Sequence, residues 1–243
     1  MRDWKGKKYW LIGASDGLGA ALARKLSEVG AEVILSARTE DKLNAVAEAL
    51  PGRARVQTVD VSSRESLESA AAAVGEVDGV VWLAGVYWPF GANDWNAEQA
   101  EEMADINFTG AMRGVGVVLP PMIARGHGHF VLTGSLTAYG GLPKSAPYTA
   151  TKAGIMALAE SLRCDTQGTD VTVQLVNPGF VRTRLTDKND FGMPGIMEPD
   201  KAAQEIFEHM NSDGFSRSFP FWFGLVFRLA RFLPPPLYFR LFS

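Results

Sequence analysis

Residues 9–19, with the sequence YWLIGASDGLG, decide the expected fold. They open with a short apolar run, Tyr9–Ile12, of the kind that forms a buried parallel strand. Gly13, Gly17 and Gly19 follow with the spacing G-x-x-x-G-x-G, and a helical pattern begins at once. Glycines allow a sharp turn and a close approach to a pyrophosphate, and the helix N-terminus offers free N–H groups to phosphates. The segment therefore favours a nucleotide site over the alternative, a tight turn without a ligand.

Apolar runs of strand length alternate with stretches of helical period along the chain. The expected strands are Tyr9–Ile12, Glu32–Ser36, Arg55–Val59, Gly79–Leu83, His129–Thr133 and Val171–Val176. The expected helices are Leu18–Val29, Thr39–Leu50, Ser63–Val74, Ala97–Ile123 and Pro147–Thr166. This alternation implies βαβ units. We therefore predict an α/β fold, Rossmann-type and doubly wound, with helices on both faces of a mostly parallel seven-stranded sheet that binds ligands at the carboxyl ends of its strands.

The composition is that of an ordinary globular protein: 47% of the 243 residues are apolar and 21% are charged. A formal net charge of −3 gives no support to nucleic-acid binding. The single cysteine, Cys164, excludes an intrachain disulfide and a cysteine-based zinc cluster, and we expect it to be packed. The first residues lack the apolar core of a secretory signal. We therefore expect a cytoplasmic location.

Positions after the second and third strands extend the nucleotide site. An acid near the end of the second strand bonds the ribose 2′-hydroxyl of NAD, whereas an arginine suits the 2′-phosphate of NADP. No acid precedes Thr39 and Arg38 is available, so NADP(H) is favoured over NAD(H). Asp16 weakens this preference, because it places a negative charge in the loop that faces the phosphates. Asp60 and Val61 end the third strand and suit the adenine edge, although a solvated Arg38 and a capping Asp60 are the alternatives.

Tyr148 and Lys152 stand four residues apart in YTATK, at the start of an expected helix. This spacing places both side chains on one helix face. A free phenol has a pKa of about 10, and a nearby ammonium lowers it. Such a phenol exchanges a proton with a carbonyl or an alcohol as hydride moves at carbon. A solvated lysine and a half-buried tyrosine are the alternatives, because the pair also arises by chance.

Two further polar residues accompany this pair. Ser135 lies just past the strand His129–Thr133, where its hydroxyl can hold a substrate oxygen. Asn107 lies within the long helical stretch, where a buried amide needs hydrogen-bond partners. These motifs occur in order, and over residues 6–210 the chain resembles the short-chain dehydrogenase/reductase family. In that resemblance, Asn177–Thr183 (NPGFVRT) matches the segment that lies near the nicotinamide.

The resemblance implies a catalytic tetrad with one role for each member. Tyr148 is the expected acid–base, and Lys152 is expected to lower its pKa and to hold the nicotinamide ribose. Ser135 is expected to orient the carbonyl, and Asn107 to support a water of the proton relay. The residues expected to bind the cofactor are Gly13, Ser15, Gly17, Leu18, Gly19, Arg38, Asp60, Val61, Ala84, Gly85, Tyr148, Lys152, Pro178, Gly179, Val181 and Thr183.

Three departures from the family's pattern are visible. The family's Asn-Asn-Ala-Gly after the fourth strand is Trp82-Leu83-Ala84-Gly85 here, so the asparagines that usually brace the central strands are missing. The usual threonine before the first glycine is Ile12, and an aromatic tail replaces the family's glycine-rich ending.

Family members are commonly dimers or tetramers, so we expect at least a homodimer built in part on the two long helices.

The segments expected around the substrate are apolar, which favours a lipophilic ketone, aldehyde or alcohol over a sugar. They contain Tyr87, Trp88, Pro89, Phe90, Leu142, Phe180, Leu185, Phe191, Met193, Ile196 and Met197, several of which could instead pack as core. The connection Arg182–Glu198 is long and without a clear period, as lids often are. His127 and His129 have no third ligand nearby, so no metal site is expected.

Residues 214–243 form a C-terminal tail of distinct composition after an expected catalytic domain over residues 1–213. The tail contains four arginines, no acid and ten of the 25 aromatic residues, so the rest of the chain carries −7. We expect Ser218–Trp222 to be the last strand and Phe223–Leu233 a short helix with Arg228 and Arg231 on one side. A further apolar turn, Leu237–Phe242, is expected after the prolines.

Arginines and aromatic rings on a short helix suit the headgroup region of a membrane, and the alternative is that the tail packs on protein. Taken together, the sequence predicts an NAD(P)-dependent oxidoreductase acting on a lipophilic carbonyl/alcohol pair. A non-catalytic, membrane-attached nucleotide sensor or scaffold is the alternative, which the intact tetrad argues against.

Overall fold

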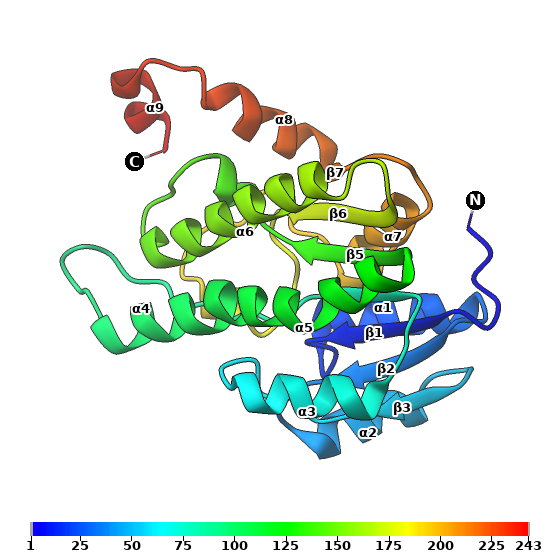
Figure 1. The fold of residues 1–243 in the computed structure, drawn as a ribbon. Coiled ribbons are helices and arrows are strands. Elements are labelled where there is room, and N and C mark those ends of the chain that lie inside the picture. The colour runs from blue at the N-terminus through cyan, green and yellow to red at the C-terminus, as the bar shows by residue number, and fades with distance from the viewer. Residues whose placement is uncertain (1, 243) are drawn as a thin grey trace.

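A seven-stranded sheet forms the centre of the computed structural model, which describes residues 2–242 (Figure 1). Every neighbouring pair of strands is parallel. The strands are β1 (Lys8–Ile12), β2 (Glu32–Ser36), β3 (Ala54–Val56), β4 (Gly79–Trp82), β5 (His127–Thr133), β6 (Asp170–Pro178) and β7 (Ser216–Phe219). Their order is β3-β2-β1-β4-β5-β6-β7, so the winding reverses between β1 and β4. Ligands of doubly wound sheets bind at this reversal.

Helices cover both faces of the sheet, which confirms the predicted fold class (Figure 1). Trp10 and Ile12 point to one face and Tyr9 and Leu11 to the other, because successive side chains of a strand alternate. The first face is covered by α3 (Arg64–Val74), α5 (Gly110–Arg125) and α6 (Ala146–Asp165). The second face is covered by α1 (Gly17–Glu28), α2 (Glu40–Glu48) and α7 (Pro199–Met210).

The long helix expected over 97–123 is three segments in succession. These are α4 (Ala97–Met103), a π-helical segment η1 (Ala104–Thr109) and α5. Sequence periodicity does not reveal a π-helical turn, because it inserts only one residue into an otherwise regular helix. The expected strand 55–59 is also shorter, since β3 ends at Val56.

One expectation near the C-terminus and one in α6 are wrong. Phe221 and Trp222 begin helix α8 (Phe221–Ala230) and do not belong to the last strand, because Pro220 before them has no N–H for the ladder and caps the helix. Cys164 is exposed and not packed. It stands five positions after the buried Ala159 of α6, which turns it about 140° away from the core.

The tail lies against the β7 end of the sheet, beside the 3₁₀ turn η2 (Leu136–Tyr139) (Figure 1). Phe227 of α8 is buried, and Tyr238 of α9 (Pro235–Phe242) donates a hydrogen bond to the Gly141 carbonyl oxygen over 2.6 Å. Arg228 turns toward Tyr139, with Nε 3.2 Å from its hydroxyl oxygen. Arg228 is nevertheless exposed, as is Arg231 three positions later, so the two share one side of the helix as the sequence had indicated. Within residues 2–242, the structure contains no helix that is long and apolar enough to cross a membrane.

Candidate active site

The glycine loop connects β1 to α1 at the carboxyl ends of the strands. Gly13 and Gly17 have positive φ angles of 99° and 51°. A Cβ atom on Gly13 would lie 2.5 Å from the Ala84 backbone nitrogen, and one on Gly17 would lie 2.7 Å from the Thr183 methyl group. A Cβ on Gly19 would collide with the Gly13 carbonyl oxygen. The loop thus needs glycine at all three positions. Because these glycines carry no side chains, the backbone at the N-terminus of α1 fits the phosphates of a dinucleotide.

Asn107 lies in η1 and faces the segment that follows β4. Its side chain makes two bonds to the Val86 backbone, accepting from the N–H over 2.7 Å and donating to the carbonyl oxygen over 2.9 Å. Its amide also donates to the Thr151 hydroxyl over 3.2 Å. The buried amide thus has partners, and it ties the π-helical turn to the loop after β4. Such turns are frequent at functional sites.

Lys152 is buried in the second turn of α6. Its ammonium group donates to the Thr133 carbonyl oxygen at the end of β5 over 2.9 Å, and it lies 5.6 Å from the centroid of the Tyr148 ring. A Cβ atom on Gly85 would come within 3.6 Å of Lys152 Nζ and 3.3 Å of Asn107 Oδ1. The structure therefore brings Tyr148, Lys152 and Asn107 together where β4 and β5 end.

The expected lowering of the Tyr148 pKa by Lys152 is absent in the polypeptide alone. Burial raises the pKa of Tyr148 to about 12, and the Ser135 hydroxyl offsets this only in part. Burial also lowers the pKa of Lys152 to about 8. Lys152 does not lower the Tyr148 pKa because its ammonium group donates to the Thr133 carbonyl oxygen and lies over the phenol ring. Near neutral pH Tyr148 is therefore protonated and can act as a proton donor.

Ser135 is buried and caps η2, where its Oγ accepts hydrogen bonds from the Thr137 N–H over 3.2 Å and from the Thr137 hydroxyl over 3.1 Å. Because Oγ accepts both bonds, the Ser135 proton is not used within η2 and can be donated to a neighbouring oxygen, that of Tyr148 or of a substrate. A Ser135 that donates its proton to a carbonyl oxygen would stabilise the negative charge that develops there.

Arg38 and Asp60 follow β2 and β3 at the same edge of the sheet. Arg38 is exposed. Asp60 accepts hydrogen bonds from the Ser62 N–H over 3.0 Å and the Ser62 hydroxyl over 2.7 Å. These hydrogen bonds hold the pKa of Asp60 below its usual value, and the charge of Arg38 contributes. Asp60 thus shapes a turn, while Ser63 caps α3.

The segment after β6 folds back over the glycine loop. Gly179 donates its N–H to the Phe219 carbonyl oxygen over 2.7 Å, which anchors the segment to β7. Val181 is buried and pairs with Met197, so the connection between them projects as a closed loop. Thr183 reaches the glycine loop through its contact with Gly17.

The remaining expected cofactor residues lie at the same edge. Ser15 and Leu18 belong to the glycine loop and the first turn of α1, and Val61 follows β3. Ala84 and Gly85 follow β4, and Pro178 ends β6. The expected cofactor residues thus gather along the carboxyl ends of the strands.

Three residues in this region were not picked out as site residues from the sequence. Lys188, from the loop 182–198, donates to the Tyr87 carbonyl oxygen over 2.8 Å and lies 4.4 Å from the centroid of the Trp88 ring. Arg184 forms an ion pair with Asp16, and Lys42 lines the same pocket. No sequence pattern singles out Lys188, because the loop 182–198 carries several other charged residues.

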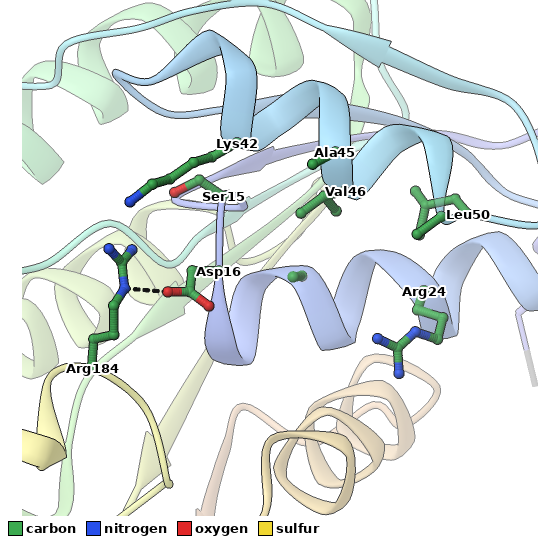
Figure 2. A pocket seen from close by; sticks show the side chains of 10 residues that line it. Ser15, Asp16, Arg24, Lys42, Ala45, Val46, Leu50 and Arg184 are labelled. Carbon is green, nitrogen blue, oxygen red and sulfur yellow. Dashed lines mark ion pairs between the residues drawn. The ribbon is translucent and has the colours of Figure 1, made fainter.

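A cavity of about 450 Å³ opens between α1 and α2, beside the glycine loop (Figure 2). Ser15, Asp16, Lys42 and Arg184 lie at its glycine-loop end, and Arg24 lies at the far end. No member of the tetrad lines it. The cavity therefore adjoins the nucleotide end of the site and not the reacting end.

Trp82 occupies the place of the first family asparagine. The indole is buried, and its Nε1 has no hydrogen-bond partner among the described residues. A Cβ atom on Gly114 of α5 would collide with the ring, so this glycine makes the room that the indole fills. Packing by Trp82 thus takes the place of the hydrogen bonds that asparagine would make.

The two histidines of GHGHF, which the sequence offered as a possible metal pair, lie in different surroundings. His127 is exposed at the start of β5. His129 is buried, with Nδ1 2.9 Å from the Tyr9 hydroxyl oxygen and Nε2 2.8 Å from Gln174 Oε1. Burial lowers the pKa of His129 to about 3, so its ring is neutral and belongs to the core.

Comparison with protein families matches residues 7–192 to the short chain dehydrogenase family. An uncharacterized oxidoreductase of Myxococcus xanthus is 35% identical, covering 98% of this chain and 97% of the relative. An uncharacterized oxidoreductase of Staphylococcus epidermidis is 34% identical, covering 85% of this chain and 91% of the relative. A crystal structure of actinorhodin polyketide ketoreductase with NADPH has a TM-score of 0.81 at 25% identity, covering 92% of this chain and 99% of that one.

The chain belongs to the short-chain dehydrogenase family. It is therefore an NAD(P)-dependent oxidoreductase, and the alternative of a non-catalytic nucleotide sensor or scaffold is not favoured.

Proposed function

We propose that this enzyme transfers hydride between NADP(H) and a lipophilic carbonyl or alcohol, with Tyr148 as the acid–base. The observation that supports this most is the convergence of Tyr148, the buried ammonium of Lys152 and Asn107 beside the glycine loop. The nicotinamide cofactor supplies or accepts the hydride.

In the reducing direction, Tyr148 gives its phenolic proton to the carbonyl oxygen as hydride reaches the carbonyl carbon, so the C=O group becomes a neutral alcohol. Once a cofactor and a substrate fill the site, the Lys152 ammonium, 5.6 Å from the centroid of the Tyr148 ring, is proposed to stabilise the phenolate until it regains a proton from solvent. Ser135 donates its free hydroxyl proton to the same oxygen and orients it. Asn107 holds the backbone at Val86 and supports a water of the relay.

The preference for NADP(H) over NAD(H) is proposed on the basis of Arg38. Its exposed guanidinium follows β2, where no acid is present to bond a ribose hydroxyl. Asp60 and Val61 are proposed to border the adenine. The glycine loop, with Ser15 and Leu18, is proposed to hold the pyrophosphate. The residues proposed on the nicotinamide side are Ala84, Gly85, Tyr148, Lys152, Pro178, Gly179, Val181 and Thr183.

The lipophilic substrate is proposed on the basis of the surroundings of Tyr148. The Tyr87 ring packs edge-on against the Tyr148 ring, with 4.9 Å between centroids. Phe90 is buried in the same cluster, and Trp88 and Leu185 pack against it. These neighbours offer apolar contacts and few hydrogen bonds, which suits a ketone or aldehyde with an apolar substituent.

The experiment is turnover by the purified enzyme with a panel of hydrophobic ketones and aldehydes, followed as loss of NADPH absorbance. We expect oxidation of NADPH that depends on the carbonyl compound and is faster with apolar members of the panel than with sugars. Equal rates with and without any carbonyl compound would contradict the proposal.

The tail is proposed to contact an anionic membrane surface on the cytoplasmic side. Large apolar side chains of α8, α9 and the connection between them are exposed: Phe221, Trp222, Leu225, Val226, Leu229, Phe232, Leu233, Leu237, Phe239 and Leu241. Arg231 and Arg240 are exposed among them, and the tail carries no acid. Rings at the headgroup level and arginines beside anionic lipids would bind such a surface.

A homodimer, or a tetramer built from dimers, is proposed through α4, α5 and α6. Met112 and Ile123 of α5 are exposed by 42% and 43%, and an interface would cover them.

A further inference from the structure

Asp16 is an unexpected residue in a loop that would face phosphates. Its carboxylate accepts a hydrogen bond from the Gly17 N–H over 2.7 Å and caps α1. Its side chain is about half exposed, so its charge reaches the adjoining cavity. A lone carboxylate there would repel a cofactor, and most of all the doubly charged 2′-phosphate of NADP.

Arg184 neutralises this charge. It forms an ion pair with Asp16 from the beginning of the loop 182–198, directly after Thr183, whose methyl group lies against Gly17 (Figure 2). Both partners are about half exposed, so the pair adds little to the stability of the fold. Its position beside the glycine loop gives it a different significance, because it determines the sign of the charge there.

The same cavity collects further groups that can bind an anion. Figure 2 shows the Lys42 amino group, the Ser15 hydroxyl and the Arg184 guanidinium at the end where the glycine loop lies. Arg24, at the far end, is already paired with Asp200 over 3.1 Å. With Arg184 present, the two cations at the near end outnumber the single carboxylate of Asp16. Without Arg184, Lys42 and Asp16 would cancel.

We propose that Arg184 contributes to cofactor choice beside Arg38: it neutralises Asp16 and, with Ser15 and Lys42, binds the ribose 2′-phosphate of NADP(H). This inference rests on the proposed use of NADP(H), and it adds a residue from the substrate-side loop to the nucleotide end of the site. It also resolves the conflict between Arg38, which favours NADP(H), and Asp16, which opposes it.

The test is binding measured by calorimetry, without turnover, for NADP⁺ and NAD⁺ and for adenosine 2′,5′-bisphosphate and adenosine 5′-monophosphate. Arg184→Gln should weaken NADP⁺ and the bisphosphate about tenfold and leave NAD⁺ and the monophosphate nearly unchanged. The double variant Asp16→Asn, Arg184→Gln should recover part of the loss, because the unpaired carboxylate is gone. Lys42→Gln should weaken only the two ligands with a 2′-phosphate.

The matched control is Arg182→Gln, which removes an exposed arginine from the same loop that pairs with Glu198 and not with the glycine loop. It should leave all four affinities unchanged. An equal loss for NADP⁺ and NAD⁺ in Arg184→Gln would overturn the inference and leave the pair as a brace of the glycine loop. Unchanged affinities would reduce it to a surface ion pair. If wild-type protein bound none of the four ligands, the proposed function itself would fail.

Discussion

Charge at single residues decides the chemistry at both ends of this site. At the reacting end, burial leaves Tyr148 protonated and lowers the pKa of Lys152 to about 8. At the nucleotide end, Arg38, Arg184 and Asp16 fix the local charge. Both ends therefore respond to substitutions that alter one charge and little else.

Arg38 is expected to set the preference between NADPH and NADH. Arg38→Asp should reverse the cofactor preference, because a carboxylate repels a 2′-phosphate and accepts a bond from a ribose hydroxyl. The measurement is the ratio of kcat/KM for NADPH to that for NADH, with an expected change of about a hundredfold or more. Arg53→Asp is the control, since Arg53 is 86% exposed at the start of β3, the opposite edge. An unchanged ratio in Arg38→Asp would remove this residue from the proposed site.

Burial of the Lys152 charge should reduce the stability of the enzyme without cofactor. The pKa falls from 10.5 unfolded to about 8 folded, so folding is penalised below pH 8, and the penalty disappears as pH rises through 10.5. Lys152→Met should therefore raise the free energy of unfolding near pH 7 by about 2 kcal/mol, after the lost bond to Thr133 is counted. The gain should shrink near pH 10.

Urea unfolding at the two pH values measures this difference. The exposed Lys201 provides the control, because Lys201→Met should shift stability equally at both. A gain for Lys152→Met that is independent of pH would mean that the ammonium group is not penalised by burial.

The strands and helices bring these residues together at one edge of the sheet. The alternation of strands and helices and the glycine loop were predictable from sequence, because buried parallel strands are continuous apolar runs and glycines are forced by close contacts such as that of Gly13 with Ala84. The π-helical turn at Asn107 was not, because one extra residue leaves the apolar period nearly unchanged. The exposed side of Cys164 and the ion pair of Arg184 depend on how distant elements pack.

The tail carries the element-scale prediction. Full-length protein should co-sediment with vesicles of phosphatidylglycerol and phosphatidylcholine at low salt, and less at high salt, because arginines meet anionic headgroups. Trp222→Ser combined with Phe232→Ser should reduce binding severalfold, since these rings are 75% and 84% exposed and support no core.

Trp95→Ser is the matched control, because Trp95 is 54% exposed but lies outside the tail. If full-length protein remains in the supernatant at low salt, the membrane contact is refuted and the exposed rings must instead meet protein.

At the scale of the whole molecule, sheet and helices form one body whose carboxyl edge carries the site (Figure 1). The described surface of α5 includes the exposed Met112, which a second copy would bury. Sedimentation velocity in the micromolar range should give a dimer or larger species, and Met112→Glu should shift it toward monomer. A monomer in the wild-type protein would contradict the proposed interface.

Tyr148 is proposed to move the proton while hydride moves at carbon. The most direct measurement compares turnover by wild type and Tyr148→Phe on a ketone accepted by the wild type, with cofactor affinity measured in parallel. The ring and its packing against Tyr87 remain in this variant, and only the hydroxyl is lost. We predict a fall in kcat of at least about a hundredfold with cofactor affinity nearly unchanged. Equal kcat in the two proteins would contradict the proposed role of Tyr148 as the acid–base.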